Sequence, residues 1–455
     1  MSSLDYLFNP ASIVLIGAAH TGIKLGGIVL KNLLNFRGKI YPVNPKYDEL
    51  MGVKAYRTIG EIPSSADLGI IMRPASEVPE ILRDLAGKVK CAIVVSSGFA
   101  EIGEHGLQSE VQRAGREAGI RLLGPNCMGV FCPGNRLDTF FITHERMKRP
   151  RKGNVAILSQ SGAIMASLFE AIRVTNTGIS KAVGYGNAVD IDESDLYEYF
   201  LEDSKTDVVV SYIESLGDGR KFLDKARALS ARKSLVVLKS GKGAGGSAAA
   251  FSHTGRLAGR YEVFHSILKQ FRIREAMDFD GLMDATKALS YQGEPGTLSR
   301  TAEGRGNRVC IVTNGGGSGV LAADECMRQG LDVVKLADDK LTCLKGMFPN
   351  FYVLHNPIDL TAQVKDDDFL TVLNELKDDY DGFVVIALPN VLGITERLAA
   401  LMKQFRKDVP KPFVFHIPTD GVSKKIITLL EKARIPVYTS PERAVKGLTA
   451  LLRPQ

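Results

Sequence analysis

The chain has 455 residues, 45% of them hydrophobic and 24% charged, with a formal net charge of +7. At about 150 residues per domain, this length predicts about three domains. No apolar run approaches the roughly 18–20 residues that span a membrane, and the first residues lack the basic segment of a signal peptide. The composition excludes membrane, collagen-like and disordered classes, so we expect a cytoplasmic globular protein.

The cysteine pattern points to a reducing compartment. The six cysteines lie too far apart to form a disulfide framework. The closest pair, Cys127 and Cys132, has neither a second pair nor a histidine at zinc-binding spacing, so we expect no metal site. The positive charge is modest and spread along the chain, which suits a small anionic ligand and gives no sign of a nucleic-acid surface.

Three blocks of the chain repeat one pattern, in which a short apolar run is followed by a glycine-bearing turn and a helical stretch. The predicted strands are 12–18, 39–43, 68–72, 91–97 and 120–124 in the first block, 154–160, 179–185, 208–215 and 234–240 in the second, and 308–314, 331–336, 382–388, 411–417 and 435–440 in the third. Continuous apolar strands that alternate with helices indicate parallel sheets covered on both faces. The predicted fold class is therefore α/β, with three doubly wound parallel-sheet domains of Rossmann-like or flavodoxin-like type. The predicted domains are 1–130, 153–290 and 307–455.

The turn after the first strand, Gly17–Gly22, is the first candidate binding site. Glycines let a backbone approach a phosphate, and the helix that follows offers free N–H groups. The spacing does not match the dinucleotide fingerprint, and the second strand ends in Asn44-Pro45-Lys46 instead of an acidic residue. This disfavours an NAD-linked oxidoreductase, whereas Lys46 suits a phosphate-bearing ribose. The alternative is that the glycines serve only tight packing.

The turn Ser159-Gln160-Ser161-Gly162 opens the second block and is the second candidate site. Ser161 is placed to cap the following helix, and the amides at the helix start would join the small hydroxyls in an anion cradle. One helix terminus contributes only about 0.3–1 kcal/mol, so a phosphate site needs further donors. The rival interpretation is the nucleophile elbow of a hydrolase, but the glycine required before the serine is absent.

The glycine-rich segment 239–259 holds the third candidate. It is not a Walker A loop, and its only imidazole is His253. Glu214 follows the strand predicted at 208–213, where its carboxylate could accept a hydrogen bond from an imidazole and fix its tautomer. A solvated histidine and a surface or helix-terminal acid remain the alternatives.

Five motifs in order resemble the α subunit, or α-like half, of NDP-forming acyl-CoA synthetases, which include ADP-forming acetyl-CoA synthetase and, more distantly, succinyl-CoA synthetase. The motifs are Leu123–Gly129, Ser159–Gly162, Val183–Asp190, Tyr212–Glu214 and Ser252–Gly259. The resemblance covers essentially the whole chain. The third block, with Thr313–Gly319 and Asn356–Leu360, is similar to an α/β domain of the acetyl-CoA-type enzymes that succinyl-type α subunits lack.

The resemblance implies a role for each candidate site. It implies that His253 carries the phosphohistidine and that Glu214 supports it. It implies a phosphate cradle at Ser159, Gln160, Ser161 and Gly162. It implies that coenzyme A is bound by Gly17, Ala18, Ala19, His20, Thr21, Gly22, Lys46, Ser96, Ser97, Gly98, Pro125 and Asn126. Met128 and Tyr185 depart from the family pattern, so we expect an acyl pocket of different shape.

The implied reaction is acyl-CoA + Pi + ADP ⇌ carboxylic acid + CoA + ATP. Phosphate attacks the thioester, His253 takes the phosphoryl group from the acyl phosphate, and the phosphohistidine delivers it to ADP. The implied partner is an ATP-grasp β subunit that holds Mg²⁺ and ADP or ATP, in an α2β2 assembly without nucleic acid or membrane. The alternative is a non-catalytic CoA-binding regulatory module of a protein acyltransferase system.

Overall fold

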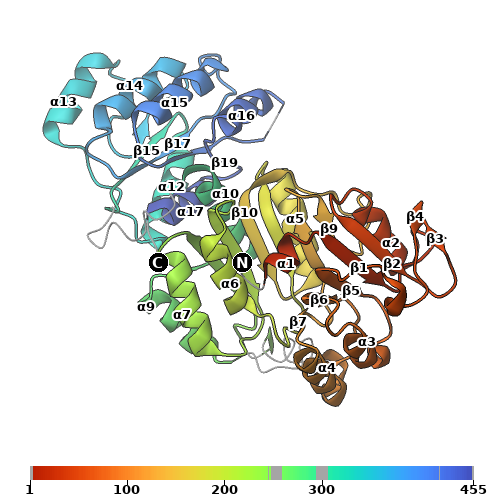
Figure 1. The fold of residues 1–455 in the computed structure, drawn as a ribbon. Coiled ribbons are helices and arrows are strands. Elements are labelled where there is room, and N and C mark those ends of the chain that lie inside the picture. Colours follow the sequence, from red (N-terminus) through yellow and green to blue (C-terminus); the bar gives the residue numbers. More distant parts are fainter. Residues whose placement is uncertain (1–3, 244, 247–258, 294–305, 420, 453–455) are drawn as a thin grey trace. The chain divides into compact units, whose positions relative to one another are not determined.

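The chain forms two compact units, Met1–Glu275 and Ala276–Gln455, each with its own sheets and core (Figure 1). The computed structural model describes residues 4–243, 245–246, 259–293, 306–419 and 421–452. The predicted α/β class is confirmed, because the three large sheets are mostly parallel and are joined by helices. The predicted three-domain boundaries stay a prediction.

The first sheet of unit 1 has the strand order β2-β1-β5-β6-β7, and all of its neighbouring strands are parallel. Its strands are β1 (Ser12–Ile16), β2 (Lys39–Val43), β5 (Leu68–Ile71), β6 (Cys91–Val94) and β7 (Arg121–Leu123). Ile13 and Leu15 enter one core with α2 (Leu25–Leu33). Val14 and Ile16 enter another core, with α3 (Val78–Asp84) and α4 (His105–Glu117). Alternate side chains thus face two covered surfaces, as the continuous apolar runs predict.

Short elements complete this part of unit 1. They are the helix α1 (Asp5–Phe8), the hairpin strands β3 (Glu49–Leu50) and β4 (Val53–Lys54), and three 3₁₀ turns, η1 (Ile59–Glu61), η2 (Ala75–Glu77) and η3 (Ala100–Ile102).

The second sheet of unit 1 has the order β14-β13-β12-β10-β11-β8-β9. Its strands are β8 (Gly129–Cys132), β9 (Leu137–Asp138), β10 (Lys152–Ser159), β11 (Ile179–Gly184), β12 (Val208–Ile213), β13 (Ser234–Lys239) and β14 (Arg274–Glu275). Its helices are α5 (Gly162–Val174), α6 (Glu193–Glu202), α7 (Gly219–Ser230) and α9 (Tyr261–Gln270).

One edge of the second sheet departs from the parallel arrangement of the other strands. β8 runs antiparallel to β11, and β9 runs antiparallel to β8. The turn that joins β8 to β9 is too short for a crossover, so the two strands pair as a hairpin. The stretch between the predicted domains 1–130 and 153–290 therefore begins inside this sheet.

Unit 2 holds a five-stranded parallel sheet in the order β16-β15-β17-β18-β19. Its strands are β15 (Val309–Thr313), β16 (Ile358–Asp359), β17 (Gly382–Ile386), β18 (Phe413–His416) and β19 (Val437–Tyr438). Its helices are α10 (Phe279–Gln292), α12 (Gly316–Arg328), α13 (Asp338–Met347), α14 (Asp366–Leu376), α15 (Arg397–Asp408), α16 (Ser423–Lys432) and α17 (Pro441–Leu452). The helix α10 packs against α17, and Arg443 pairs with Asp284 at 2.7 Å between them.

The strand predicted at 331–336 does not form, and β16 stands beside β15 in its place. The physical reason is Asn356. Its Nδ2 donates hydrogen bonds to the carbonyls of Val309 (2.8 Å) and Val334 (2.9 Å), and its Oδ1 accepts one from the N–H of Ile311 (3.0 Å). A side chain therefore occupies the backbone positions of β15 that a neighbouring strand would use.

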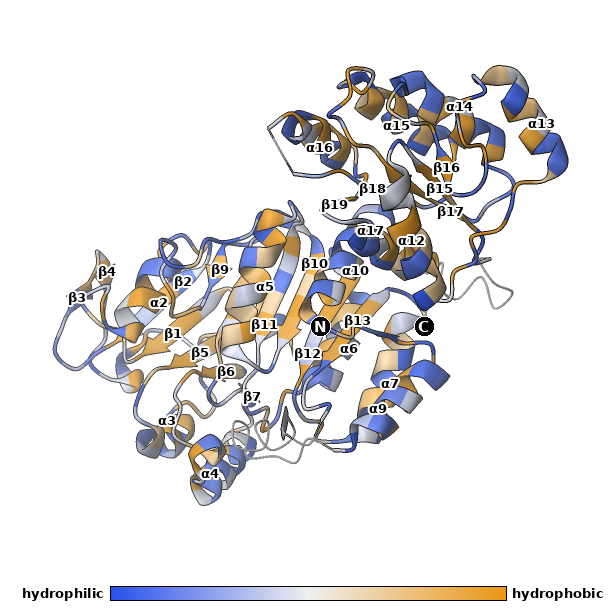
Figure 2. Ribbon diagram, turned by 180° about the vertical axis from the view of Figure 1, so that it is seen from behind, coloured by the Kyte–Doolittle hydropathy of each residue, from blue (hydrophilic) through white to orange (hydrophobic). Residues whose placement is uncertain are grey.

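The hydropathy of the chain follows these layers. Figure 2 shows hydrophobic residues concentrated on the strands, while the helices present hydrophobic and hydrophilic residues on different sides. Burial on both faces accounts for the apolar runs from which the strands were predicted.

Candidate active site

A cavity of about 490 Å³ lies in unit 1, where turns of the first sheet meet the start of α5. It is lined by Leu25, Met72, Arg73, Val95, Ser96, Ser97, Asn126, Cys127, Met128, Phe141, Gln160 and Gly162. Most of these residues follow the carboxyl ends of parallel strands, which is where α/β sheets bind ligands. Ser96, Ser97 and Asn126 come from the predicted CoA site, whereas Gln160 and Gly162 come from the predicted phosphate cradle. The fold thus brings the two predicted sites to one cavity.

The turn after β1 lies against the end of β2. The Asn44 side chain donates to the carbonyl of Ala18 (2.7 Å), and its Oδ1 accepts from the N–H of Lys46 (2.8 Å). The His20 and Tyr47 rings stack with their centroids 5.5 Å apart. These contacts place the backbone of Lys46 next to the glycine turn, and its role in binding CoA stays a prediction.

Several glycines of this region are required by packing, among them Gly17 and Gly26. Gly17 has φ +86°, and a Cβ there would lie 2.4 Å from the carbonyl oxygen of Met72. A Cβ on Gly26 would lie 2.0 Å from the carbonyl oxygen of Gly17. Tight packing therefore explains these two positions by itself, whereas a Cβ on Gly22 would meet only the Lys31 side chain, at 3.9 Å, so Gly22 stays a candidate for ligand contact.

The turn after β6 is held by Glu101. Its Oε1 accepts from the N–H of Gly98 (2.6 Å), and its Oε2 accepts from the side chain of Asn187 (2.7 Å). Burial alone would raise the pKa of Glu101, but the hydrogen bonds from Gly98 and Asn187 lower it below its ordinary value. The N–H of Asn187 also donates to the carbonyl of Pro125 (3.0 Å). The loop after β11 thus supports Ser96–Gly98 and Pro125–Asn126 together.

The phosphate cradle was predicted at the start of α5. Ser161 is the N-cap, as predicted, and its Oγ accepts from the N–H of Ile164 at 3.4 Å. The Ser159 hydroxyl donates to the carbonyl of Ser161 (2.7 Å) and accepts from its N–H (3.1 Å). These bonds fix the turn, and they leave the first N–H groups of α5 beyond the reach of helical partners.

Gln160 connects this turn to the end of β12. Its Oε1 accepts from the N–H groups of Glu214 (2.5 Å) and Ser215 (2.9 Å), and its Nε2 donates to the carbonyl of Ser215 (2.8 Å). Its own N–H donates to the carbonyl of Tyr212 (3.3 Å). Gln160 lines the cavity, so its role as a phosphate ligand stays a prediction. The hydrogen bonds give it a second role, which is to fix the backbone that carries Glu214.

Lys239 supports the backbone at Glu214, a contact that the sequence analysis did not predict. It ends β13 beside Ile213 of β12, is buried, and donates from Nζ to the carbonyls of Glu214 and Ser240, both at 2.6 Å. Burial lowers the pKa of Lys239 to about 8, although Glu214 and Glu275 act in the opposite direction. A lysine at the end of an otherwise apolar strand was the available signal.

His253 lies outside the described residues, so its predicted pairing with Glu214 stays a prediction. Glu214 directly follows β12, as expected, and it is buried.

Cys127 lines the cavity but is not a nucleophile at neutral pH. It is buried, and its Sγ donates to the carbonyl of Val94 at 3.3 Å. Burial raises the pKa of the thiol to about 12, so the thiolate that would attack a substrate is absent near pH 7.

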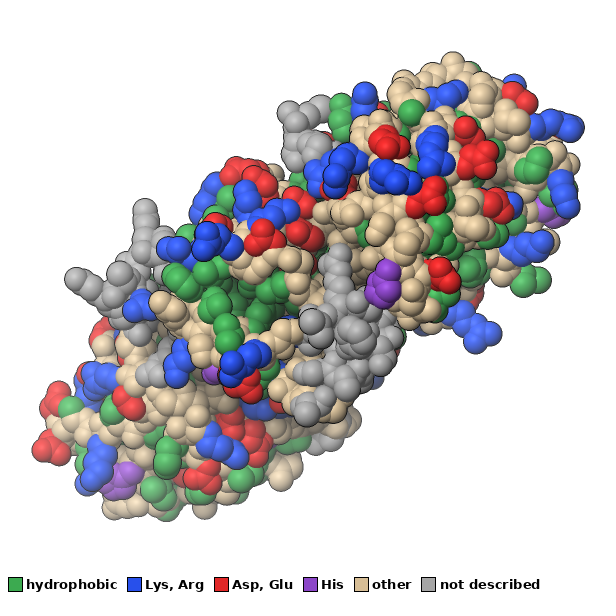
Figure 3. Space-filling view, turned by 90° about the horizontal axis from the view of Figure 1, so that it is seen from below, with side chains coloured by type: hydrophobic (Ala, Val, Ile, Leu, Met, Phe, Trp, Pro, Cys, Tyr) green, Lys and Arg blue, Asp and Glu red, His purple; other side chains and the backbone are tan. Residues whose placement is uncertain are grey.

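Two features are absent from the described part of the chain. No group of three or more His, Cys, Asp or Glu side chains there could hold a metal ion. No helix there is both long and apolar enough to cross a membrane. Figure 3 shows Lys and Arg interspersed with Asp and Glu over one face, so this face carries no field of a single sign.

Three family models match successive parts of the chain. They describe a CoA binding domain at residues 11–133, a succinyl-CoA ligase like flavodoxin domain at 152–289 and a Ligase-CoA domain at 309–453. The fold and the cavity therefore define a protein of the CoA-ligase class.

Proteins that are similar to this chain over its full length identify the family within this class. The α subunit of acetate–CoA ligase [ADP-forming] II of Pyrococcus furiosus is 35% identical over 99% of this chain and 97% of its own length. The acetate–CoA ligase [ADP-forming] of Methanocaldococcus jannaschii is 36% identical, and the chain spans 63% of its length. A solved structure of dinucleotide forming acetyl-coenzyme A synthetase 1 of Ca. Korarchaeum cryptofilum, with phosphate and ADP, aligns with a TM-score of 0.89 at 34% identity, over 99% of this chain and 96% of that one. The chain therefore belongs to the family of ADP-forming acyl-CoA ligases, among their α subunits and α-like halves.

Proposed function

We propose that this chain is the α subunit of an enzyme that catalyses acyl-CoA + Pi + ADP ⇌ carboxylic acid + CoA + ATP. One observation carries the proposal: residues predicted to bind CoA and residues predicted to bind phosphate line the same cavity. A thioester held by the first set then lies next to a phosphate held by the second, which is the arrangement that phosphorolysis requires.

The chain's own residues have defined tasks in this reaction. The turn at Gly17–Gly22 and Lys46 bind CoA, and the start of α5 binds phosphate through helix N–H groups and the Ser161 hydroxyl. Phosphate attacks the thioester carbonyl, the thiolate of CoA leaves, and an acyl phosphate forms. His253 then takes the phosphoryl group, and the carboxylate leaves. Glu214 orients the imidazole by accepting its N–H.

The final transfer to ADP needs a second component. We assign Mg²⁺ and the nucleotide to an ATP-grasp β subunit in an α2β2 assembly. Two curated relatives from Pyrococcus furiosus are named as α subunits, which supports a separate partner. The cysteines of the described structure are free and five of the six are buried, which fits a reducing cytoplasm.

The test combines the purified chain with its β subunit, ADP, phosphate and an acyl-CoA, and measures the released thiol. Labelled phosphate should appear on the chain as an acid-labile, base-stable adduct, and His253→Asn should abolish both the label and turnover. His355→Asn, at an exposed position of unit 2, is the matched control and should keep both.

The outcomes separate two functions. Equal labelling of wild type and His253→Asn would overturn the assignment of His253. Tight CoA binding with neither thiol release nor label would favour the regulatory CoA-binding module instead.

A further inference from the structure

One charged side chain lies at the cavity of unit 1. Among the described residues that line this cavity, only Arg73 carries a charge. It comes two residues after the end of β5, and its side chain is 44% exposed. CoA and phosphate, the ligands of the proposed function, are both anions. A cation at this place therefore has a counter-charge in the ligand, and its surroundings indicate in which part.

Arg73 lies between two segments of the predicted CoA site. A Cβ built on Gly17, in the turn after β1, would lie 3.1 Å from Cδ of Arg73, so the stem of the arginine packs on this turn. The Ser96 hydroxyl, in the turn after β6, donates to the carbonyl of Arg73 at 2.5 Å. β1 and β6 pair with β5 on opposite sides, so the sheet itself places Arg73 between the two turns.

The edge of the first sheet presents these turns in a fixed order. Because the strand order is β2-β1-β5-β6-β7, the residues that follow the strands stand in the order Lys46, Gly17, Arg73, Ser96 and Asn126. Lys46 is predicted at the phosphate-bearing ribose of CoA, and Ser96 and Asn126 line the cavity in which the thiol end reacts. An extended CoA between these places passes the end of β5. The charged group of CoA between its ribose and its thiol is the diphosphate.

The guanidinium of Arg73 is held by Glu77, four residues further along the chain. Nε donates to Oε2 at 2.9 Å, and Nη2 donates to Oε1 at 3.0 Å. Both side chains are more than 40% exposed, and exposed ion pairs of this kind contribute little to stability. Nη1 donates to no described residue, so its two N–H groups remain for a ligand. A guanidinium of this kind binds phosphate oxygens through a planar fork of donors.

We propose that Arg73 binds the diphosphate of CoA and that Glu77 limits the strength of this contact. Glu77 orients the guanidinium at the end of β5, but its negative charge repels an anion bound at the same place. The two residues therefore act on the affinity for CoA with opposite signs. The inference rests on the proposed function, because that function places CoA along this edge of the sheet.

Calorimetry on the purified full chain tests the proposal with CoA and with dephospho-CoA, which lacks the 3′-phosphate but keeps the diphosphate. We expect Arg73→Gln to raise both dissociation constants by the same factor, about tenfold, since it removes a charge-assisted contact. Glu77→Gln should lower both about two- to fivefold, because the amide still accepts a hydrogen bond while the repulsive charge is gone. Arg113→Gln, in another exposed pair four residues apart, with Glu117 on α4, is the matched control and should change neither.

The opposite signs separate ligand binding from a structural role, since loss of a stabilising pair would weaken CoA binding in both variants. Weaker binding in both, or an unchanged affinity in Arg73→Gln, would overturn the proposal. So would a larger loss for CoA than for dephospho-CoA, which would assign Arg73 to the 3′-phosphate.

Inorganic phosphate is the remaining source of the anion. The KM for phosphate, measured by thiol release from the complex with the β subunit, should stay unchanged in Arg73→Gln. A raised KM for phosphate at an unchanged dissociation constant of CoA would contradict the assignment to the diphosphate. If the complex releases no thiol although the chain binds CoA, the proposed function fails, and the dissociation constants still decide the role of Arg73.

Discussion

At the scale of single residues, Gln160 has the most informative environment in the site. Its carboxamide satisfies the N–H groups of Glu214 and Ser215 in a buried turn. Gln160→Leu keeps much of the volume but leaves these two donors without a partner, at a cost of about 1–3 kcal/mol each. We expect phosphohistidine formation to slow about 10- to 100-fold, while CoA affinity stays within about twofold, because the predicted CoA contacts lie on the first sheet.

The rate of labelling and the dissociation constant of CoA measure the two effects separately. Gln404→Leu, on the exposed side of α15, is the matched control and should leave both unchanged. A Gln160→Leu variant that labels at the wild-type rate would show that Gln160 does not position Glu214.

Lys239 gives the folded chain a pH dependence of known sign. Burial lowers its pKa from 10.5 to about 8 in the folded chain. Between these values the unfolded chain binds the proton and the folded chain does not, so a rise in pH favours folding. Through this group alone, the free energy of unfolding should increase by about 2 kcal/mol between pH 8 and 9.5.

Urea unfolding of wild type and Lys239→Met at the two pH values isolates this contribution as a difference. Lys425→Met, which removes a lysine that is 72% exposed, should follow the wild-type pH profile. If Lys239→Met and wild type keep a constant stability difference over this range, Lys239 stays protonated in the folded chain.

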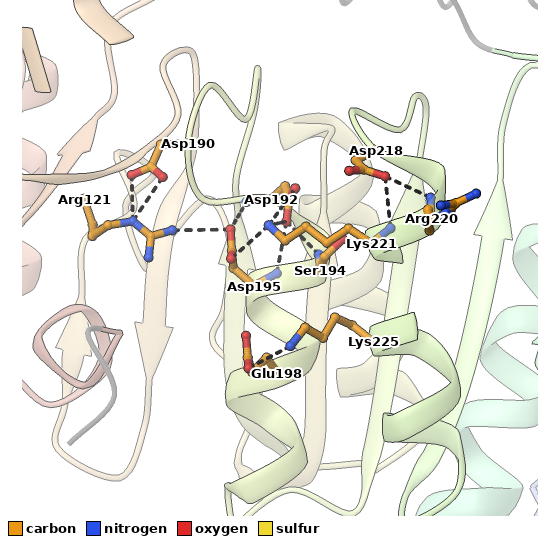
Figure 4. Close-up of polar contacts among 10 residues, drawn as sticks. All are labelled: Arg121, Asp190, Asp192, Ser194, Asp195, Glu198, Asp218, Arg220, Lys221 and Lys225. Carbon is orange, nitrogen blue, oxygen red and sulfur yellow. Dashed lines mark hydrogen bonds and ion pairs between the residues drawn. The ribbon is translucent and has the colours of Figure 1, made fainter. Parts of the chain in front are cut away.

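At the scale of elements, an ion-pair network joins the two sheets of unit 1 (Figure 4). Nε of Arg121, on β7, lies 2.9 Å from Oδ2 of Asp190, in the loop after β11. The Arg121 guanidinium also reaches Asp195 on α6 at 3.3 Å. Lys221 of α7 lies 3.0 Å from Asp195, while Asp192 caps α6. The network therefore fixes β7, which leads into the predicted CoA residues Pro125 and Asn126, relative to the helices of the second sheet.

Arg121→Met should lower the free energy of unfolding by about 2 kcal/mol, because Asp190 and Asp195 lose a partly buried partner. CoA affinity should fall with it, since Pro125 and Asn126 follow β7. Lys225→Met, which breaks the exposed pair with Glu198 on the same helices, should cost less than about 0.5 kcal/mol. Equal denaturation midpoints for the two variants would contradict a role of the network in holding the sheets together.

The elements also show what sequence patterns can predict. β1 and β2 were predicted because their apolar runs are continuous, which reflects burial on both faces. The strand expected at 331–336 does not form, because the side chain of Asn356, more than twenty residues away, bonds the backbone groups that would pair it with β15. The predicted sites met in one cavity because strand ends of parallel sheets converge, whereas the roles of Gln160 and Lys239 depend on which strands become neighbours. A local pattern does not contain that information.

At the scale of the whole molecule, the described site lies entirely in unit 1. Unit 2 has its own sheet and its own core, built on Val312, Phe369 and Phe383 among others. The helix α10 belongs to that unit through ion pairs with its later elements, including Lys287 with Glu431. The predicted CoA and phosphate residues that line the cavity are therefore all part of unit 1.

The nucleotide step leads to the last prediction, which is that this chain alone does not make ATP. The three matched domains cover most of the 455 residues, and the stretches between them are too short for an ATP-grasp unit of about 150–200 residues. The chain spans only 63% of the longer Methanocaldococcus jannaschii relative, so that protein has sequence beyond the part matched here.

The isolated chain should therefore show no ADP-dependent thiol release with acyl-CoA and phosphate, and should gain it when the β subunit is added. A His253→Asn chain mixed with the same β subunit serves as the control and should stay inactive. Multiple-turnover ATP synthesis by the isolated chain would reveal a nucleotide site within these residues.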